Sequence, residues 1–379
     1  MSFSIVRQPL LITSQSSKRT VALFVPDLNI GGAEKTIVSL ANELALENIP
    51  VDLLLMNSEG ELLDQVSEGV RIIELFKGTV STNKLFLLFR SVSGLIHYMN
   101  KVRPTVILSS VFGANITTIL SSLLTRSDIQ VVIREASSLK NYSLIEKLLI
   151  KALYFRSKKI IAVSKSGATQ LEKFIGAKKG QIEVIHNAVS ISKIRALAKR
   201  DISLEEFSSK PYIVSVGRLV EAKAFDILIE AFWTCSKLYS QINLVIVGEG
   251  PQRTVLENKI EMLGLSDKVI LLGEKTNPFP YIKEAELFVL SSRWEGFPNT
   301  LLEAMCLGVP IVATDCEFGP KEILSEVRAN ELVPVDNVEH LTRAINLILS
   351  GSSEPIDYSA TLSDFSYEKI IKQYSDILS

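Results

Sequence analysis

Short runs of β-branched and other apolar residues alternate with amphipathic helical patterns along most of the chain. The first run begins at Val21 and the last ends at Ala313. This alternation is typical of parallel sheets built from β-α-β units, so the sequence predicts an α/β fold. We expect strands at 21–25, 51–55, 70–73, 105–108, 130–133, 160–163, 182–185, 212–216, 244–247, 269–272, 287–290 and 310–313.

The chain has 379 residues, which exceeds the roughly 100–200 residues of a typical domain, so two domains are expected. A charged segment without a strand pattern interrupts the alternation near its middle and is the best candidate for a linker. The predicted organisation is a polar leader at 1–19, domains at 20–190 and 211–360 joined by a linker at 191–210, and a terminal helix at 361–379 that can pack on either domain.

Charge and cysteine content exclude several classes of protein. Lys and Arg total 41 and Asp and Glu total 42, so no overall basic field attracts nucleic acid. The three cysteines, Cys235, Cys306 and Cys316, form neither a disulfide framework nor a Cys-x-x-Cys metal motif. No apolar stretch approaches the ~18 residues that cross a bilayer. We therefore expect a cytoplasmic protein in a reducing compartment.

Ligands of open parallel sheets bind beyond the carboxyl ends of the strands. Gly31 and Gly32 follow the first expected strand, where backbone could approach an anion at a helix start. A tight turn between strand and helix explains them equally well. Arg218 and Lys223 follow the strand at 212–216 and could neutralise a diphosphate together, whereas in isolation they would be ordinary surface charges.

Two further motifs follow later strands. The segment 247–251, Val-Gly-Glu-Gly-Pro, begins like a dinucleotide fingerprint but lacks its third glycine, so an ordinary turn is as plausible as a nucleotide contact. Glu295 and Glu303 flank a loop and a helix start in the segment Glu-Gly-Phe-Pro-Asn-Thr-Leu-Leu-Glu. A capping box formed by Thr300 and Glu303 is the purely structural explanation for the second carboxylate.

Taken together, these motifs resemble a known family. The spacing of Glu295 and Glu303 looks like the E-x7-E motif of retaining nucleotide-sugar glycosyltransferases of family GT4, which have the GT-B fold. The Gly-Gly-Ala-Glu-Lys, Val-Gly-Arg and Val-Gly-Glu-Gly-Pro segments resemble that family in the same order. The resemblance spans about 21–324, and it implies two Rossmann-like parallel-sheet domains that face a cleft.

The resemblance also implies roles for individual residues. Arg218 and Lys223 would bind the leaving diphosphate, Glu303 the ribose hydroxyls and Glu295 the donor sugar, while Gly31 and Gly32 would close over the donor. The catalytic set is thus Arg218, Lys223 and Glu295, and the remaining donor-binding set is Gly31, Gly32, Gly217, Gly296, Phe297, Pro298, Asn299, Thr300 and Glu303.

The donor, a UDP-linked sugar, is a substrate, and no cofactor is expected. Fixed cations stabilise the charge that develops on a departing diphosphate. The chain has no Asp-x-Asp sequence that would hold a divalent ion on the phosphates, so no metal site is predicted. Retention in this family is ascribed to attack from the side of the leaving group, so no protein nucleophile is assigned.

The acceptor side of the resemblance is less complete. Relatives place a His beside the Arg-Glu pair that follows a strand of the first domain, whereas this chain has Arg134 and Glu135 in the segment Ile-Arg-Glu-Ala-Ser. These two residues are expected either to line the acceptor site or to form an internal ion pair. The segment 318–322, Phe-Gly-Pro-Lys-Glu, is similar to that of transferases of bacterial surface polysaccharide assembly, some of which use N-acetylhexosamine or galactose donors.

Two basic amphipathic segments bear on the acceptor. The segments 84–103 and 144–159 combine apolar residues with Lys and Arg, a pattern that suits an anionic membrane surface. They could equally be outer helices that bury their apolar face on the sheet. We expect a glycan acceptor linked to polyprenyl diphosphate at the inner face of the cell membrane. The alternatives are a non-catalytic sugar-nucleotide-binding protein and an epimerase or phosphorylase of similar fold.

Overall fold

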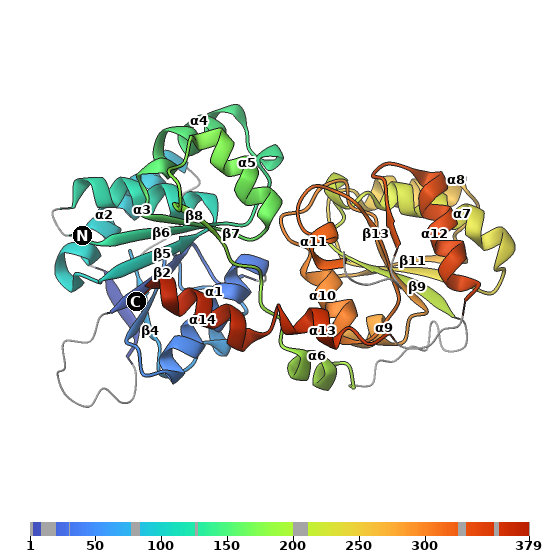
Figure 1. The fold of residues 1–379 in the computed structure, drawn as a ribbon, viewed down its shortest axis with the longest axis horizontal. Coiled ribbons are helices and arrows are strands. Elements are labelled where there is room, and N and C mark those ends of the chain that lie inside the picture. The colour runs from blue at the N-terminus through green and yellow to red at the C-terminus, as the bar shows by residue number, and fades with distance from the viewer. Residues whose placement is uncertain are drawn as a thin grey trace. The chain divides into compact units, whose positions relative to one another are not determined.

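The chain forms two compact units, each built around its own sheet (Figure 1). The computed structural model describes residues 3–8, 20–29, 31–76, 84–125, 128–199, 211–324, 331–351 and 356–378. The first unit consists of Met1–Asn187 and Ile370–Ser379, and the second consists of Ala188–Lys369. No helix within the described residues is long and apolar enough to cross a membrane.

The first unit contains an eight-stranded sheet with the order β1-β4-β3-β2-β5-β6-β7-β8. All neighbouring strands are parallel except β1, which runs antiparallel to β4. The strands are β1 (Ser4–Arg7), β2 (Val21–Val25), β3 (Val51–Leu55), β4 (Arg71–Glu74), β5 (Val106–Ser110), β6 (Gln130–Glu135), β7 (Lys159–Ala162) and β8 (Ile182–Val184).

Helices cover both faces of this sheet, as Figure 1 shows. On one face, a buried cluster joins Phe24 and Ile133 of the sheet to Tyr98 and Ile119 of two covering helices. The helices of this unit are α1 (Gly32–Leu46), α2 (Lys84–Val102), α3 (Phe112–Leu124), α4 (Leu144–Leu153), α5 (Lys165–Ile175) and most of α14 (Tyr367–Leu378), with short 3-10 turns η1 (Leu63–Gln65), η2 (Leu139–Asn141) and η3 (Tyr154–Arg156).

The second unit contains a six-stranded sheet in which all neighbours are parallel, with the order β11-β10-β9-β12-β13-β14. The strands are β9 (Tyr212–Val216), β10 (Asn243–Val247), β11 (Val269–Gly273), β12 (Leu287–Leu290), β13 (Ile311–Thr314) and β14 (Glu331–Val333). The helices are α6 (Ile191–Leu197), η4 (Glu221–Lys223), α7 (Phe225–Leu238), α8 (Arg253–Met262), α9 (Phe279–Lys283), α10 (Asn299–Cys306), α11 (Pro320–Leu324), α12 (Val338–Leu349) and α13 (Ser359–Ser363).

Each predicted strand is present, with ends that differ by at most two residues, and the predicted α/β class of two parallel-sheet units is confirmed. The polar leader, however, contains a strand that the sequence pattern did not predict, because Ile5 and Val6 of β1 lie at a sheet edge and stay 43% and 46% exposed. Helix α6 occupies the first part of the expected linker, and 200–210 lie outside the described residues.

Candidate active site

The carboxyl ends of β9, β10, β12 and β13 lie at one edge of the second sheet, because these neighbouring strands are parallel. Lys223 ends a short 3-10 turn after β9, and the following residue, Ala224, has a φ of +49°. The side chain of Lys223 lies over Gly217, since a Cβ atom at Gly217 would be 3.2 Å from Lys223 Cε. A larger residue at position 217 would therefore displace the Lys223 side chain.

Lys223 and Glu295 form an ion pair. The distance from Lys223 Nζ to Glu295 Oε1 is 2.5 Å, and the side chains are only 19% and 10% exposed. The Ser292 hydroxyl donates a second hydrogen bond to the same carboxylate oxygen at 2.6 Å. The structure thus brings together two residues from the catalytic set that are 72 positions apart. An ammonium group has three N–H donors, so Lys223 can bind Glu295 and an anionic ligand together.

Arg218 differs from Lys223 in its surroundings. It lies in the same loop after β9, but its side chain is exposed and makes no hydrogen bond or ion pair with another described residue. An exposed guanidinium with no internal partner keeps its planar fork available for a phosphate. Arg218 and Lys223 therefore share a loop but differ in how firmly they are held.

The Gly-x-Gly segment after β10 packs directly on this loop. Gly248 has a φ of +149°, and a Cβ atom there would lie 1.9 Å from the Gly217 carbonyl oxygen. A Cβ atom at Gly250 would lie 2.5 Å from the Leu219 carbonyl oxygen, and the Leu219 amide donates to the Glu249 carbonyl at 2.9 Å. Both glycines are thus explained by close backbone packing, which favours the turn that the sequence left as an alternative to a nucleotide contact.

The start of α10 lies beside Glu295. The helix begins at Asn299 with Pro298 as its N-cap, and no side chain caps it. Gly319, with a φ of +106°, packs so closely on Pro298 that a Cβ atom would lie 2.4 Å from the proline Cδ. Phe297 is buried and its ring lies 5.9 Å from that of Phe365, between centroids. The loop before α10 is therefore held firmly from two sides.

The capping box expected as the structural explanation for Glu303 is wrong. Because the N-cap is Pro298, Thr300 is the second residue of α10 and Glu303 the fifth, so neither holds the position that a capping box requires. The Thr300 hydroxyl is buried and has no hydrogen-bond partner among the described residues. Glu303 is half-buried on the same helix, and helix capping does not account for it.

Arg293, two residues before Glu295, belongs to none of the predicted catalytic, donor-binding or acceptor residues. Its guanidinium donates to the Asp226 carboxylate at 2.7 and 3.1 Å, to Asp336 at 2.6 Å and to the Glu221 carbonyl at 2.9 Å. Its backbone amide donates to the Ala222 carbonyl at 2.8 Å. Arg293 therefore ties the loop that carries Lys223 to the loop that carries Glu295.

The surroundings of these loops shift the pKa values of Asp226 and Cys316 in opposite directions. Burial alone would raise the Asp226 pKa, but the hydrogen bonds and charge of Arg293 outweigh it and hold the pKa below its usual range. Burial, with a smaller contribution from the charge of Glu295, raises the pKa of the Cys316 thiol to about 12. A protonated thiol is a poor nucleophile, so Cys316 is a buried packing residue.

Gly31 and Gly32 begin α1 in the first unit, with Gly31 as the N-cap. The Glu34 carboxylate folds back over Gly31, where a Cβ atom would lie 2.1 Å from Glu34 Oε2. Burial raises the Glu34 pKa, the backbone N–H of Glu34 lowers it and the nearby charge of Asp27 raises it. Glu34 thus occupies the helix start that was predicted to receive an anion.

Arg134 and Glu135 lie at the end of β6, and among the described residues no ion pair or hydrogen bond joins their side chains. Arg134 is fully buried, and it donates to Tyr374 at 3.1 Å, Ser110 at 3.2 Å and Asn187 at 2.5 Å. Glu135 is also buried, and burial is the main reason for its raised pKa. It accepts hydrogen bonds from the Ser137 amide and from the hydroxyls of Tyr142 and Tyr154. With its guanidinium buried, Arg134 has no surface to offer an acceptor.

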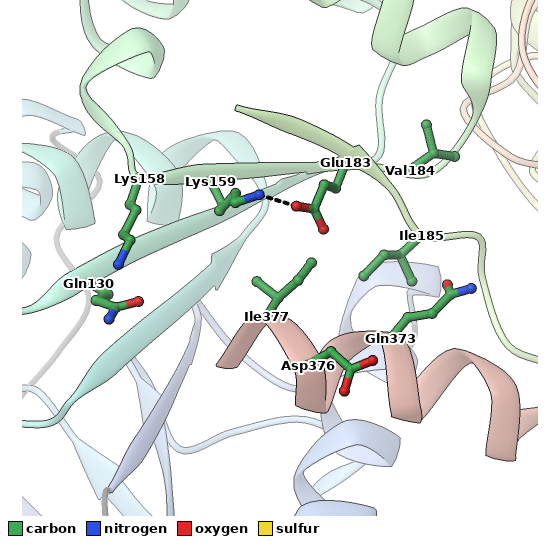
Figure 2. A pocket seen from close by; sticks show the side chains of 9 residues that line it. All are labelled: Gln130, Lys158, Lys159, Glu183, Val184, Ile185, Gln373, Asp376 and Ile377. Atoms are coloured by element: carbon green, nitrogen blue, oxygen red, sulfur yellow. Dashed lines mark hydrogen bonds and ion pairs between the residues drawn. The ribbon is translucent and has the colours of Figure 1, made fainter. Parts of the chain in front are cut away.

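A pocket of about 580 Å³ in the first unit lies away from the predicted sites (Figure 2). Gln130 and Lys159, the first residues of β6 and β7, line it, so it faces the amino ends of these strands. Lys159 is ion-paired with Glu183. Among the described residues, no three His, Cys, Asp or Glu side chains gather as metal ligands.

Comparison with known proteins identifies the family. The family Glycosyltransferase Family 4 matches residues 30–193, and the family Glycosyl transferases group 1 matches residues 199–362. A Campylobacter jejuni relative, the N-acetylgalactosamine-N,N'-diacetylbacillosaminyl-diphospho-undecaprenol 4-alpha-N-acetylgalactosaminyltransferase, is 28% identical over 345 residues, which are 87% of this chain and 90% of that protein.

Solved structures agree in fold. Anabaena HepE in complex with UDP and glucose is 20% identical, with a TM-score of 0.79 over 95% of this chain and 99% of that one. A Rickettsia africae glycosyltransferase is 19% identical, with a TM-score of 0.78 over 96% of this chain and 98% of that one. The resemblance to the GT-B fold is confirmed, and the chain belongs to the GT4 family of glycosyltransferases.

Proposed function

We propose that this enzyme transfers a hexosyl or N-acetylhexosaminyl group from a UDP-linked donor to a glycan on polyprenyl diphosphate, with retention of anomeric configuration. The observation that carries the proposal is the Lys223–Glu295 pair beside the uncapped start of α10. The Campylobacter jejuni relative is named for transfer to an undecaprenol-linked glycan, and HepE was solved with UDP and glucose. Both support the proposed donor and acceptor classes.

In this proposal, Lys223 and Arg218 bind the diphosphate of the donor. The bond between the sugar C1 and the phosphate oxygen breaks, a bond from C1 to the acceptor oxygen forms on the same face, and the acceptor proton passes to the leaving phosphate. Negative charge grows on the diphosphate as it departs, so positioned cations stabilise the transition state more than the bound donor. Lys223 is suited to this role because Glu295, Ser292 and Gly217 fix its environment.

The carboxylates have separate roles. Glu295 accepts hydrogen bonds from the donor sugar and orients the ammonium of Lys223. Glu303 accepts from the ribose hydroxyls, a role supported by the finding that helix capping does not explain it. Gly217, Gly296, Phe297, Pro298, Asn299 and Thr300 complete the proposed donor site. The N–H groups at the start of α10 suit the negative charge of the donor.

Glu34 and Arg134 refine the proposed part of the first unit. If Gly31 and Gly32 approach the donor, the Glu34 carboxylate moves off the start of α1 or binds a donor hydroxyl, because a phosphate and a carboxylate repel one another. Arg134 and Glu135 position the end of β6 through their buried hydrogen bonds. We place the enzyme in the cytoplasm at the inner face of the membrane, in assembly of surface polysaccharide or lipid-linked oligosaccharide.

The test is a screen of labelled UDP-sugars with the purified full chain and a membrane extract as the acceptor source. Label in the lipid-soluble fraction together with released UDP supports the proposal. Donor binding without transfer would point to a sugar-nucleotide-binding protein. Conversion of the donor without any acceptor would point to an epimerase, and sugar release by inorganic phosphate would point to a phosphorylase. Any of these three results rejects the proposed transfer.

A further inference from the structure

Helix α4 turns an apolar face to solvent. Leu144, Ile145 and Leu148 are 80%, 72% and 67% exposed, and Leu149 is exposed as well. Among the residues of this helix only Ile150 is buried. Scattered single exposed leucines are ordinary, but a contiguous group on one helix marks an interaction surface.

The other amphipathic segment behaves differently. Helix α2 buries Leu95, Tyr98 and Met99 completely in the core of the first unit. Helix α2 is therefore an outer helix that buries apolar residues on the sheet, which is the alternative given above to a membrane-binding role for the two segments. Helix α4 also packs on this core, through Ile150 and Leu153. That packing does not account for Leu144, Ile145 and Leu148, which stay exposed.

The charges on α4 are arranged around the apolar face. Successive residues of a helix are rotated by about 100°, so Leu144 and Leu148 form one stripe along α4. Ile145 and Leu149 form a second stripe on one side of it. Lys147 and Lys151 form a third stripe on its other side. Glu146 is the only acidic residue of the helix. Its carboxylate accepts from the backbone N–H and the hydroxyl of Ser143 in a capping box at the helix start. The exposed face therefore combines aliphatic side chains with lysines only.

We propose that this α4 surface, made of Leu144, Ile145, Leu148, Leu149, Lys147 and Lys151, docks the enzyme on an anionic lipid bilayer. Aliphatic side chains enter the boundary between head groups and acyl chains, while flanking lysines contact the anionic head groups. The uniform positive charge of the flank favours a bilayer over a second copy of the chain, because two copies would place their lysines together. This proposal rests on the proposed function, because docking would bring the enzyme to a lipid-linked acceptor.

The test is flotation of the full chain with vesicles of phosphatidylcholine alone or mixed equally with phosphatidylglycerol. We expect binding to the anionic vesicles only, falling as salt is raised. The double variant Leu144→Gln/Leu148→Gln, which keeps good helix formers, should lower the bound fraction about tenfold or more. Lys147→Gln/Lys151→Gln should weaken binding and flatten its salt dependence. The control Leu238→Gln/Leu347→Gln removes two exposed leucines of α7 and α12 and should bind like the unchanged protein.

Three results would overturn the proposal. One is equal flotation of the Leu144→Gln/Leu148→Gln variant and the control. Another is equal binding of the unchanged protein to both kinds of vesicle. The third is concentration-dependent dimerisation that the same double variant abolishes, without vesicle binding. Transfer to a water-soluble acceptor analogue is measured in parallel. If the unchanged protein binds anionic vesicles but transfers no sugar to this analogue, the proposed function is rejected and the docking surface is not.

Discussion

Variants that neutralise Lys223 and Glu295 can show whether this ion pair only stabilises the fold or also binds the donor. The Lys223 side chain is 19% exposed and the Glu295 side chain 10% exposed, and the distance from Lys223 Nζ to Glu295 Oε1 is 2.5 Å. Lys223→Met leaves the Glu295 carboxylate with the hydrogen bond from the Ser292 hydroxyl but without its cationic partner. An uncompensated, largely buried charge costs about 2–3 kcal/mol, which is below the ~3–5 kcal/mol of a fully buried pair. For a domain of this size that lowers the Tm by roughly 4–12 °C.

The double variant Lys223→Met/Glu295→Gln removes both charges and should regain most of this stability, because no unpaired charge remains. Its turnover should stay about 30- to 1000-fold below that of the unchanged protein, since Lys223 no longer stabilises the leaving diphosphate. Thermal unfolding and initial rates of UDP release are measured on the same preparations. A double variant that regained stability and also turned over within threefold of the unchanged protein would refute the assignment of Lys223 and Glu295 to the donor.

Four further outcomes test the same site. Arg218→Ala should lower turnover about 30-fold or more without changing the Tm, because the side chain is exposed; normal rates of UDP release would remove Arg218 from the site. Glu303→Gln should weaken UDP binding about tenfold or more in calorimetric titration, and equal dissociation constants would return Glu303 to a structural role. Arg293→Leu leaves the Asp226 carboxylate without its main partner, so stability should fall at neutral pH and the loss should shrink in acid. The sign follows because the Asp226 pKa is lowered on folding, so its contribution is present above the unfolded pKa of ~3.9 and is lost as the pH falls through the folded pKa. Turnover should persist in excess EDTA. If EDTA abolished turnover and added magnesium restored it, the conclusion that cationic side chains alone stabilise the leaving diphosphate would be wrong.

The interior strands could be predicted because they are buried on both faces. β2, β3, β5 and β10 are buried along their whole length, and each carries a run of at least three consecutive apolar residues. The short edge strands β1 and β14 are partly exposed and carry no such run, and the sequence reading missed them. A long apolar run reports burial on both faces, whereas β1 has four residues with none buried and β14 has three with only Val333 buried.

The loops of the site could be located for a similar reason, but the contacts between them could not. Each loop follows a recognisable strand, and parallel strands bring their carboxyl ends to one edge. The Lys223–Glu295 pair and the bonds of Arg293 depend on how loops pack across the sheet, which no local pattern encodes. The capping-box prediction failed because Pro298 moved the helix start ahead of Thr300.

The discontinuity of the first unit has a consequence for biosynthesis. Its last part, Ile370–Ser379, is made after the whole of the second unit, which is one continuous segment. Until that tail leaves the ribosome, the buried guanidinium of Arg134 lacks the hydroxyl of Tyr374, and the first unit lacks the apolar side chains of Ile370 and Leu378. The second unit can therefore reach its final form before the first, which is completed only after Ile370–Ser379 has left the ribosome.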